Sequence, residues 1–352
     1  MSKRCIVIGA SAGGFEVILD IVSRLPADLP APVFVVMHIP AYHPSYLPSI
    51  LSKTGPLRAI HPEDGMRVEP GFIYIAPPDH HLLVDDGHIA VKRGPKENGF
   101  RPSIDALFRS AAYSYGPGAI GVVLSGALHD GTSGLWTIKR LGGIAIVQDP
   151  ADAEYASMPR SALEYVDADY KVRSTEVSEL LVRLANEPLK KESRAGNEIE
   201  KDLEERIATE VQIAAGTNVS QQHVLDLGDL APYSCPDCHG SLVRIKEGKH
   251  SRFRCHTGHG FTEDALLEGI MQTTGESIWQ VTRGLQETVM LLQHMGSHIQ
   301  EAGDHAQAEK FFAKARELEK RASRFQELAK ENESMSGNKL EMPGEKGEQP
   351  IH

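Results

Sequence analysis

The sequence predicts an α/β fold in which a doubly wound, mostly parallel sheet carries a small antiparallel hairpin. Three observations lead to this prediction. Short apolar runs alternate with helical patterns over the first 186 residues, a cysteine/histidine cluster follows at 235–259, and helical periodicity fills 263–331. The apolar runs lack strict polar alternation, which is typical of parallel strands covered on both faces. We therefore expect a sheet domain first, then a small cysteine/histidine module, then a helical hairpin.

Five apolar runs are expected to form the strands of the parallel sheet, at 5–8, 33–37, 72–75, 120–124 and 144–147. Helical patterns lie between them at 15–25, 104–114 and 135–141. Residues 82–91 predict a β-hairpin, because Asp86 and Gly87 stand where a tight turn is needed. Strands that alternate with helices in this way build a doubly wound sheet.

Composition divides the chain into five segments. They are the α/β domain at 1–186, a charged linker at 187–229, the cysteine/histidine module at 230–262, the helical hairpin at 263–333 and a tail at 334–352. The linker mixes charges and contains one helical pattern, at 198–214. The tail is polar and holds glycine and proline, so it is expected to be disordered.

The helical segment carries apolar residues three or four positions apart on both sides of Gly303-Asp304. This pattern predicts two helices joined by a short turn. The two stripes consist of Ile278, Val281, Leu285, Val289, Leu292 and Met295, and of Phe311, Ala315, Leu318, Ala322 and Phe325. We expect the stripes to pack on each other; a docking surface for partner helices or a dimer seam is the alternative, and the oligomeric state stays open.

Charge and hydropathy exclude several classes of protein. The net charge of −11 over 352 residues disfavours nucleic-acid binding. No run approaches the roughly 20 apolar residues that span a bilayer, so no membrane insertion is expected. The basic start, Met1-Ser2-Lys3-Arg4, precedes only four apolar residues, too few for a signal-peptide core. A cytoplasmic location is therefore expected.

Three polar residues follow the ends of predicted strands. Ser11 follows the first strand, His38 follows the second, and Asp130 lies a few residues beyond the fourth. The carboxyl ends of parallel strands share one edge of the sheet, so these side chains are expected to converge there as a catalytic triad. Each also has a structural alternative, since Ser11 or Asp130 can cap a helix and His38 can simply be hydrogen-bonded.

The residues around Ser11, Gly9-Ala10-Ser11-Ala12-Gly13, match the nucleophile-elbow pattern G-x-S-x-G. They also suit a phosphate-binding loop of the dinucleotide-binding kind. That second reading is disfavoured because His38 stands where an acidic residue would bind ribose. The chain order Ser, His, Asp differs from the orders in α/β-hydrolases, chymotrypsin and subtilisin.

The first half of the chain resembles the catalytic domain of the CheB-type chemotaxis methylesterases, that is, protein-glutamate methylesterases. The resemblance covers roughly residues 3–186. It is carried by the segments Ile8-Gly9-Ala10-Ser11-Ala12-Gly13-Gly14, Met37-His38-Ile39-Pro40, Pro70-Gly71-Phe72-Ile73-Tyr74-Ile75-Ala76-Pro77, Arg101-Pro102-Ser103-Ile104-Asp105-Ala106-Leu107-Phe108, Ser125-Gly126-Ala127-Leu128-His129-Asp130-Gly131 and Met158-Pro159-Arg160.

The resemblance implies that Ser11 is the nucleophile, His38 the general acid/base and Asp130 the partner of His38. It implies a substrate, the γ-methyl ester of glutamate on the cytoplasmic helices of methylated chemoreceptors, or the corresponding glutamine amide. Such chemistry needs no catalytic cofactor. The backbone N–H groups of Ala12 and Gly13 are the expected oxyanion donors, because they lie at a helix start.

The chain departs from the family pattern at three points. Ala12 replaces the usual threonine, and Gly126-Ala127-Leu128 replaces the usual Gly-Met-Gly. The catalytic domain is not preceded by the receiver domain that many relatives carry, so control by receiver phosphorylation is not expected. These departures leave an alternative open, in which the chain is a catalytically weak signalling scaffold that binds receptors or partners through the same fold and its helical tail.

The later cysteines predict a structural zinc site in a zinc-ribbon-like module. Cys235 and Cys238 form a CxxC pair, and Cys255 and His259 supply a second pair. Three thiolates and one imidazole fill a tetrahedral shell, so this metal is not expected to be catalytic. His256 is the alternative fourth ligand, and a redox-active CxxC is the alternative to a metal.

Overall fold

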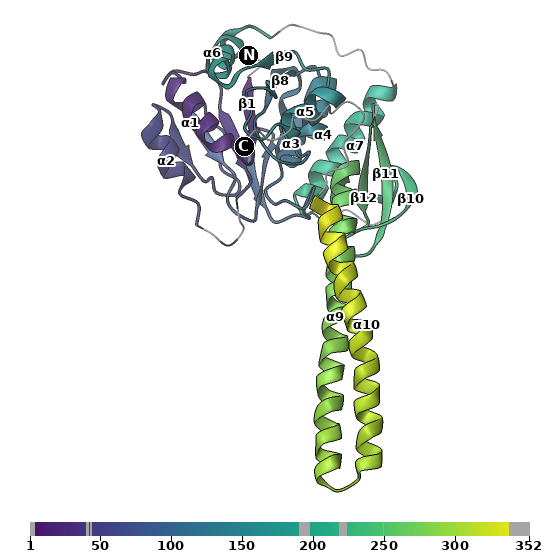
Figure 1. Ribbon diagram of the computed structural model, residues 1–352. Coiled ribbons are helices and arrows are strands. Elements are labelled where there is room, and N and C mark those ends of the chain that lie inside the picture. The colour runs from purple at the N-terminus through teal and green to yellow at the C-terminus, as the bar shows by residue number, and fades with distance from the viewer. Residues whose placement is uncertain are drawn as a thin grey trace. The chain divides into compact units, whose positions relative to one another are not determined.

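The computed structural model describes residues 4–39, 42, 44–189, 198–217, 224–248 and 250–337. The chain divides into two compact units, Met1–Leu266 and Leu267–His352 (Figure 1). The first holds the α/β domain and a small antiparallel sheet, and the second holds most of two long helices. Within the expected tail, the last helix continues to Gly337, and the residues beyond it lie outside the described part of the chain.

The first unit is built on a seven-stranded sheet in which every neighbouring pair is parallel. The strands stand in the order β3 (Arg58–Ile60), β4 (Phe72–Ile75), β2 (Val33–Met37), β1 (Cys5–Ala10), β7 (Ala119–Val123), β8 (Ile144–Gln148) and β9 (Tyr170–Val172). The five predicted strands are confirmed to within two residues at each end. The two edge strands, β3 and β9, were not predicted, because three residues are too few to show a periodic pattern.

The predicted hairpin is confirmed as β5 (His81–Asp85) and β6 (His88–Lys92), which pair antiparallel in a sheet of their own. Both turn residues have positive φ, 41° at Asp86 and 77° at Gly87. This geometry belongs to the turn whose twist matches that of the flanking strands, and Asp-Gly favours it.

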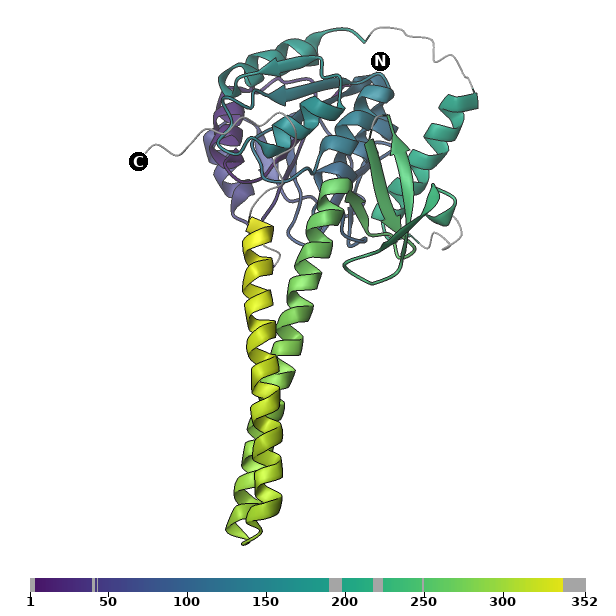
Figure 2. The ribbon, with the colours of Figure 1, turned by 45° about the vertical axis from the view of Figure 1, so that its right-hand side comes forward.

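Helices cover both faces of the parallel sheet, so the sheet lies between two hydrophobic cores (Figures 1 and 2). One face is covered by α1 (Gly14–Arg24), α2 (Leu47–Thr54) and α6 (Ser174–Asn186), and the other by α3 (Ile104–Tyr115), α4 (Thr132–Arg140) and α5 (Ser157–Tyr165). A 3₁₀ turn at Gly116–Gly118 leads into β7. Burial on both faces explains the unbroken apolar runs in the central strands.

The centre of the sheet is the point where the chain changes direction across it. Strand β1 pairs with β2 on one side and β7 on the other, with Ala10 opposite Met37 and Gly9 opposite Val123. The residues that follow these three strands therefore meet at one edge. In open α/β sheets such a switch point is where ligands bind.

The rest of the first unit is α7 (Glu198–Ala214) and an antiparallel sheet of four strands. The strands are β10 (Asp229–Ser234), β11 (Ser241–Glu247), β12 (His250–Cys255) and β13 (Gly260–Thr262), paired in sequence order. Seven buried cysteine, phenylalanine, leucine and alanine side chains form its small core, together with the first turn of the helix that follows β13. So small a core buries little apolar area, which favours a second source of stability.

A buried charge cluster joins this small sheet to the α/β domain. Its members are Glu97, Arg109 of α3, Glu210 of α7, Glu247 of β11, and Arg252 and Arg254 of β12, each at most 4% exposed. Arg109 donates to both carboxylate oxygens of Glu97 at 3.1 Å, and Arg254 Nη2 donates to Glu97 at 2.9 Å. Arg252 Nη2 donates to Glu210 Oε2 at 2.7 Å. The cluster therefore ties three separate parts of the chain together.

The charges in this cluster hold its acids ionised. Burial alone would raise the pKa of Glu97, but Arg109, Arg254 and Arg252 outweigh it and lower that pKa to about 2. Burial alone would also raise the pKa of Glu210, but the same three arginines outweigh it and lower that pKa. Removing any one partner would leave an uncompensated buried charge.

The second unit consists of α9 from Leu267 onward and α10 (His305–Gly337); α9 as a whole spans Glu263–Glu301. The two helices run antiparallel and are separated at 302–304, as predicted. A Cβ on Gly296 would lie 2.6 Å from the ring of Phe312, and one on Gly275 would lie 2.8 Å from Asn332. No helix within the described residues is long and apolar enough to cross a lipid bilayer.

Small residues at seven-residue spacing form the contact between the two helices. On α9 they are Gly275, Thr282, Val289 and Gly296, and on α10 they are Ala308, Ala315, Ala322 and Ala329. All four alanines are at most 5% exposed. The predicted stripes are therefore partly wrong, since Val281 is 46% exposed and Met295 is 41% exposed. Small side chains let the helix axes approach closely, which pushes larger residues to the flanks.

We expect Ala315→Leu to loosen the helical hairpin and Ala313→Leu to leave it unchanged. Ala315 lies in the contact, where overpacking costs about 1–3 kcal/mol, whereas Ala313 is exposed, where substitutions stay within about 0.5 kcal/mol. Amide hydrogen exchange in α9 and α10 measures the difference. Equal protection in the two variants would contradict this packing.

We expect the first unit to lose stability as the pH falls from about 4.5 towards 2. Glu97 and Glu210 have lower pKa values folded than unfolded, so their contribution is present above the unfolded values and is lost as the pH falls through the folded ones. Chemical denaturation at a series of pH values measures it. The Glu97→Gln control should be less stable at neutral pH and should vary less with pH. Equal pH dependence in both proteins would count against the cluster.

Candidate active site

Ser11, His38 and Asp130 lie together at the carboxyl edge of the sheet. Ser11 follows β1, His38 follows β2, and Asp130 lies in the turn before α4. His38 Nδ1 is 3.2 Å from Ser11 Oγ, and His38 Nε2 is 2.9 Å from Asp130 Oδ2. The imidazole side chain is 6% exposed and the carboxylate is fully buried. A continuous hydrogen-bonded chain thus runs from a buried acid to a hydroxyl at the rim.

The ring nitrogens of His38 have distinct partners, which fixes their roles. Asp130 is a carboxylate and can only accept, so Nε2 carries the proton and donates to it. Nδ1 is then free to accept the Ser11 hydroxyl proton. This is the reverse of the best-known serine triads, in which Nε2 faces the serine. The geometry still supplies what a general base needs, an unprotonated nitrogen within reach of the hydroxyl.

The carboxylate of Asp130 is held at the amino end of α3. It accepts from the backbone N–H groups of Ile104 at 2.7 Å and Asp105 at 3.2 Å, and from the Ser103 hydroxyl at 2.9 Å. Burial would raise the pKa of Asp130, but hydrogen bonds from His38, Ile104 and Asn98 outweigh it and lower that pKa to about 2. Asp130 thus also caps a helix, although the helix is α3 and not α4.

Two polar residues beside Asp130 were not predicted to belong to the site. Asn98 donates through Nδ2 to Asp130 Oδ1 at 3.1 Å and to Asp105 Oδ2 at 2.9 Å. Asp105 also accepts from Gly134 N–H at 2.6 Å. Burial and the adjacent charge of Asp130 raise the pKa of Asp105 well above its usual range. Asn98 and Asp105 do not end strands, so their positions gave no signal in the sequence.

Phe100 stacks on the imidazole of His38. The ring centroids are 3.8 Å apart and the planes differ by 6°. An aromatic face this close restricts the rotation of the imidazole and shields it from solvent. Phe100 was also missed, because it lies in the loop before α3, where sequence patterns are weakest.

The backbone around Ser11 leaves two N–H groups available. Gly14 N–H donates to Ser11 O and Ser11 N–H donates to Ser125 O, each at 3.0 Å. Within the described residues, neither Ala12 N–H nor Gly13 N–H has a hydrogen-bond acceptor. Gly13 precedes α1 with a φ of 69°, and a Cβ there would lie 2.7 Å from Glu154. Glycine is therefore required at this turn.

The loop between β7 and Asp130 also packs against the serine. A Cβ on Gly126 would lie 2.1 Å from Met158 Sδ and 2.9 Å from Ser11 Cβ. Leu128 adopts a φ of 67°, which is uncommon for a residue other than glycine. It is one of the residues at which the chain departs from the usual Gly-Met-Gly. The backbone keeps a left-handed turn there despite the side chain.

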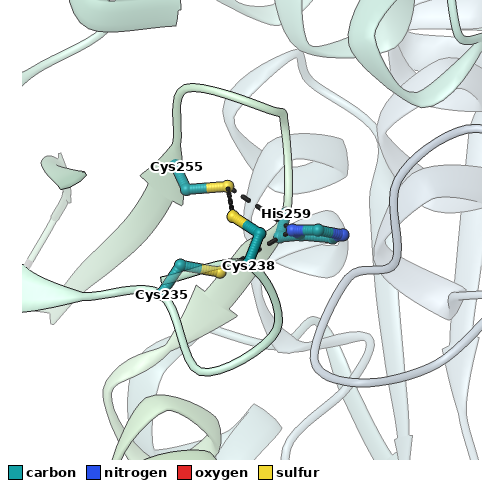
Figure 3. A group of neighbouring side chains, drawn as sticks. All are labelled: Cys235, Cys238, Cys255 and His259. Atoms are coloured by element: carbon teal, nitrogen blue, oxygen red, sulfur yellow. Dashed lines mark hydrogen bonds between the residues drawn. The ribbon is translucent and has the colours of Figure 1, made fainter. Parts of the chain in front are cut away.

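A second group of reactive side chains lies in the small antiparallel sheet (Figure 3). Cys235 and Cys238 lie in the turn from β10 to β11, Cys255 ends β12, and His259 precedes β13. Their ligand atoms lie within 4.8 Å of one another. His256 is not part of this group and lies instead against Gly240.

The chain matches the family model described as CheB methylesterase over residues 6–181. A protein of Leptospira interrogans, named provisionally as a protein-glutamate methylesterase/protein-glutamine glutaminase, is 40% identical over 185 residues, which cover 52% of this chain and 96% of that one. The protein-glutamate methylesterase FrzG of Myxococcus xanthus is 39% identical over 159 residues, covering 45% of this chain and 48% of that one.

Relatives from Thermotoga maritima give a similar result. The protein-glutamate methylesterase/protein-glutamine glutaminase of that organism is 36% identical over 188 residues, covering 52% of this chain and 55% of that one. The crystal structure of the Thermotoga maritima CheB methylesterase catalytic domain aligns with a TM-score of 0.49 at 36% identity, over 52% of this chain and all of that one. The family model and the Leptospira relative together show that the chain belongs to the CheB methylesterase family.

Proposed function

We propose that this protein hydrolyses γ-methyl esters of glutamate side chains on other proteins, with Ser11 as nucleophile, His38 as general acid/base and Asp130 as the partner of His38. The observation that carries the proposal is the hydrogen-bonded chain from Asp130 through His38 to Ser11. A buried acid, an oriented base and a partly exposed hydroxyl are the elements of serine-type acyl transfer. The methylesterase names of the relatives agree with this chemistry.

In the first half of the reaction, Ser11 Oγ attacks the ester carbonyl carbon as its proton passes to His38 Nδ1. The carbonyl oxygen becomes an oxyanion, and the N–H groups of Ala12 and Gly13 are the proposed donors to it. When the intermediate collapses, the bond to the methoxy oxygen breaks and His38 returns the proton to that oxygen. Methanol leaves, and a glutamyl ester of Ser11 remains.

In the second half, His38 removes a proton from water, and the resulting hydroxide attacks the same carbonyl carbon. The bond to Ser11 Oγ breaks, His38 protonates that oxygen, and the carboxylic acid of glutamate is released and loses its proton to solvent. The carboxylate of Asp130 stabilises the imidazolium that forms in each half. A glutamine side chain would follow the same route with ammonia as the leaving group, and no cofactor enters any step.

The proposed partners are methylated chemoreceptors, and the proposed location is the cytoplasm, where their methylated helices lie. Supporting this, relatives carry names that specify protein glutamate as the group acted on. The three clustered cysteines form no disulfide bond with one another, which suits a reducing compartment. The alternative is a signalling scaffold that binds the same receptors without turnover, and the replacement of threonine by Ala12 is the feature that favours it.

We expect Ser11→Ala and His38→Ala each to lower turnover roughly 10⁴-fold or more with the fold retained, because each removes a member of the triad. Methanol release from a methylated receptor fragment measures turnover. Ser23→Ala and His88→Ala, at exposed positions, are matched controls and should keep full activity. Turnover of Ser11→Ala within tenfold of the wild type would exclude the triad; receptor binding without fluorophosphonate labelling of Ser11 would favour the scaffold.

We expect Phe100→Ala to lower kcat by about 10- to 100-fold while KM changes little, because the imidazole loses the ring that fixes its plane. Phe100→Tyr retains the aromatic face and should keep most of the activity. Steady-state kinetics on a small methyl ester distinguish the two variants. Equal kcat values in Phe100→Ala and the wild type would show that the stacking has no role in turnover.

A further inference from the structure

The cysteine/histidine group of the small sheet has the dimensions of a tetrahedral metal site. Bonds of about 2.3 Å to sulfur and about 2.0 Å to nitrogen give ligand separations of about 3.8 Å between sulfurs and about 3.5 Å between sulfur and nitrogen. The Sγ atoms of Cys238 and Cys255 are 3.6 Å apart, and His259 Nδ1 is 3.7 Å from Cys235 Sγ and 3.5 Å from Cys255 Sγ. The side chains are already placed at the corners of such a site.

The surrounding backbone holds these ligands in place. Cys235 N–H donates to Gly240 O and His239 N–H donates to Cys235 O, both at 2.8 Å. In the second loop, Cys255 N–H donates to His259 O at 3.0 Å. Thr257 Oγ1 lies within 3.0–3.2 Å of Cys238 Sγ, Cys255 Sγ and His259 Nδ1. Three sulfurs and one nitrogen match zinc, and with every ligand supplied by the protein the site would be structural.

The metal loop, residues 256–259 between β12 and β13, continues directly into contacts with the loop before α3. Gly260 follows His259, and its N–H donates to Lys96 O at 3.2 Å while its carbonyl accepts from Asn98 N–H at 2.7 Å. Two residues further on, Thr262 N–H donates to Asn98 Oδ1 at 2.8 Å. The backbone and side chain of Asn98 are thus both held by β13.

Asn98 is the link from β13 to the triad. Its amide oxygen is bound to Thr262, so its amide nitrogen is directed at Asp130 Oδ1 and Asp105 Oδ2. Asn98 is 7% exposed and has a φ of 53°, which the bonds to β13 help to hold. Asn98 and Gly99, whose φ values are 53° and 81°, form a two-residue turn between Glu97 and Phe100, and Asn-Gly favours that backbone. The bonds to β13 therefore matter chiefly for the direction of the Asn98 side chain.

The charge cluster also connects the metal-binding loops to residues 97–98. Arg254, next to Cys255, donates to Glu97 Oε1 at 2.9 Å and to Gly258 O in the metal loop at 2.7 Å. Glu97 is next to Asn98 in the chain. Cys255 and His259, the second pair of ligands, are therefore each next to a residue that bonds to Glu97 or Asn98.

We propose that Cys235, Cys238, Cys255 and His259 bind one zinc ion, and that the zinc-bound sheet positions Asn98 so that it orients the triad carboxylate. Asn98 is a positioning residue that acts through Asp130. The catalytic half of this inference rests on the proposed function, whereas the metal half does not. Loss of zinc frees β13, the amide of Asn98 turns away, and Asp130 loses one of the donors that fix its direction toward His38.

Elemental analysis of the purified full chain tests the metal half. We expect about one zinc per chain in the wild type, loss of zinc in Cys238→Ser and His259→Ala, and retention of zinc in the matched control His256→Ala. A wild type that takes up no zinc after incubation with it would overturn the site. Loss of zinc in His256→Ala alone would overturn the ligand set.

Kinetics per titrated active site test the coupling. Metal-free chain, checked for folding by circular dichroism, should show kcat roughly 10-fold lower than zinc-loaded chain with similar KM, and added zinc should restore it. Zinc-loaded Asn98→Ala should show the same loss, and metal removal from it should cause little further change. Lys96→Ala, which keeps the backbone contact to Gly260, should be unaffected. The coupling would be overturned if metal removal and Asn98→Ala together lowered kcat by the product of their separate effects. It would also be overturned if either change alone left kcat unchanged.

A readout that does not need turnover separates this inference from the proposed function. The proton on His38 Nε2 that faces Asp130 should give a downfield NMR resonance in zinc-loaded wild type and none in His38→Ala. We expect it to weaken or vanish in metal-free chain and in zinc-loaded Asn98→Ala. If the resonance depends on zinc and Asn98 but no ester is hydrolysed, the function fails and the positioning stands. If the metal-free chain unfolds, an unchanged resonance and kcat in zinc-loaded Asn98→Ala overturn the positioning.

Discussion

The buried carboxylate of Asp130 organises the edge of the sheet where Ser11 and His38 lie. It accepts from the first N–H groups of α3, from Ser103, from Asn98 and from His38. Those donors come from different parts of the chain, so one ionised group fixes a helix end, a loop and an imidazole at once. A buried charge is tolerated only when it is hydrogen-bonded in this way, which makes the whole arrangement interdependent.

The same dependence extends into the antiparallel sheet. The amide nitrogen of Asn98 donates to Asp130, and its amide oxygen accepts from the backbone N–H of Thr262. Beside it, three buried carboxylates, Glu97, Glu210 and Glu247, balance the charges of three buried arginines. Replacing such a cluster with apolar residues can leave stability unchanged, so its contribution is better understood as specificity of docking. Arg254 of β12 and Arg109 of α3 share Glu97, and Arg252 and Arg109 share Glu210.

The helical hairpin obeys a different rule. Its contact uses glycine, alanine and other small residues at seven-residue intervals, while Met290 and Leu291 are 60% and 58% exposed. If burial of apolar area alone determined the contact, the larger apolar residues would lie in it. Close approach of two helix backbones instead favours the smallest side chains, because the gain comes from many short contacts along the whole pair.

The sequence by itself determined the parallel sheet and its order of elements, since apolar runs, turn residues and helical spacing are local properties. It also singled out Ser11, His38 and Asp130, because residues that end parallel strands must share an edge. The two-strand hairpin was equally readable from Asp86-Gly87. Short edge strands such as β3 were not, because their three residues carry no period.

Only the tertiary structure decided which other groups surround the site. Asn98, Phe100 and Asp105 lie in or just after a loop. Asn98-Gly99 has the pattern of a tight turn, but nothing local places that turn, or the other two residues, beside the site. Their places depend on where α3 begins and where β13 docks, which are properties of contacts between distant segments. The tautomer of His38 depends likewise on which ring nitrogen faces the carboxylate, and a linear sequence contains no information on that orientation.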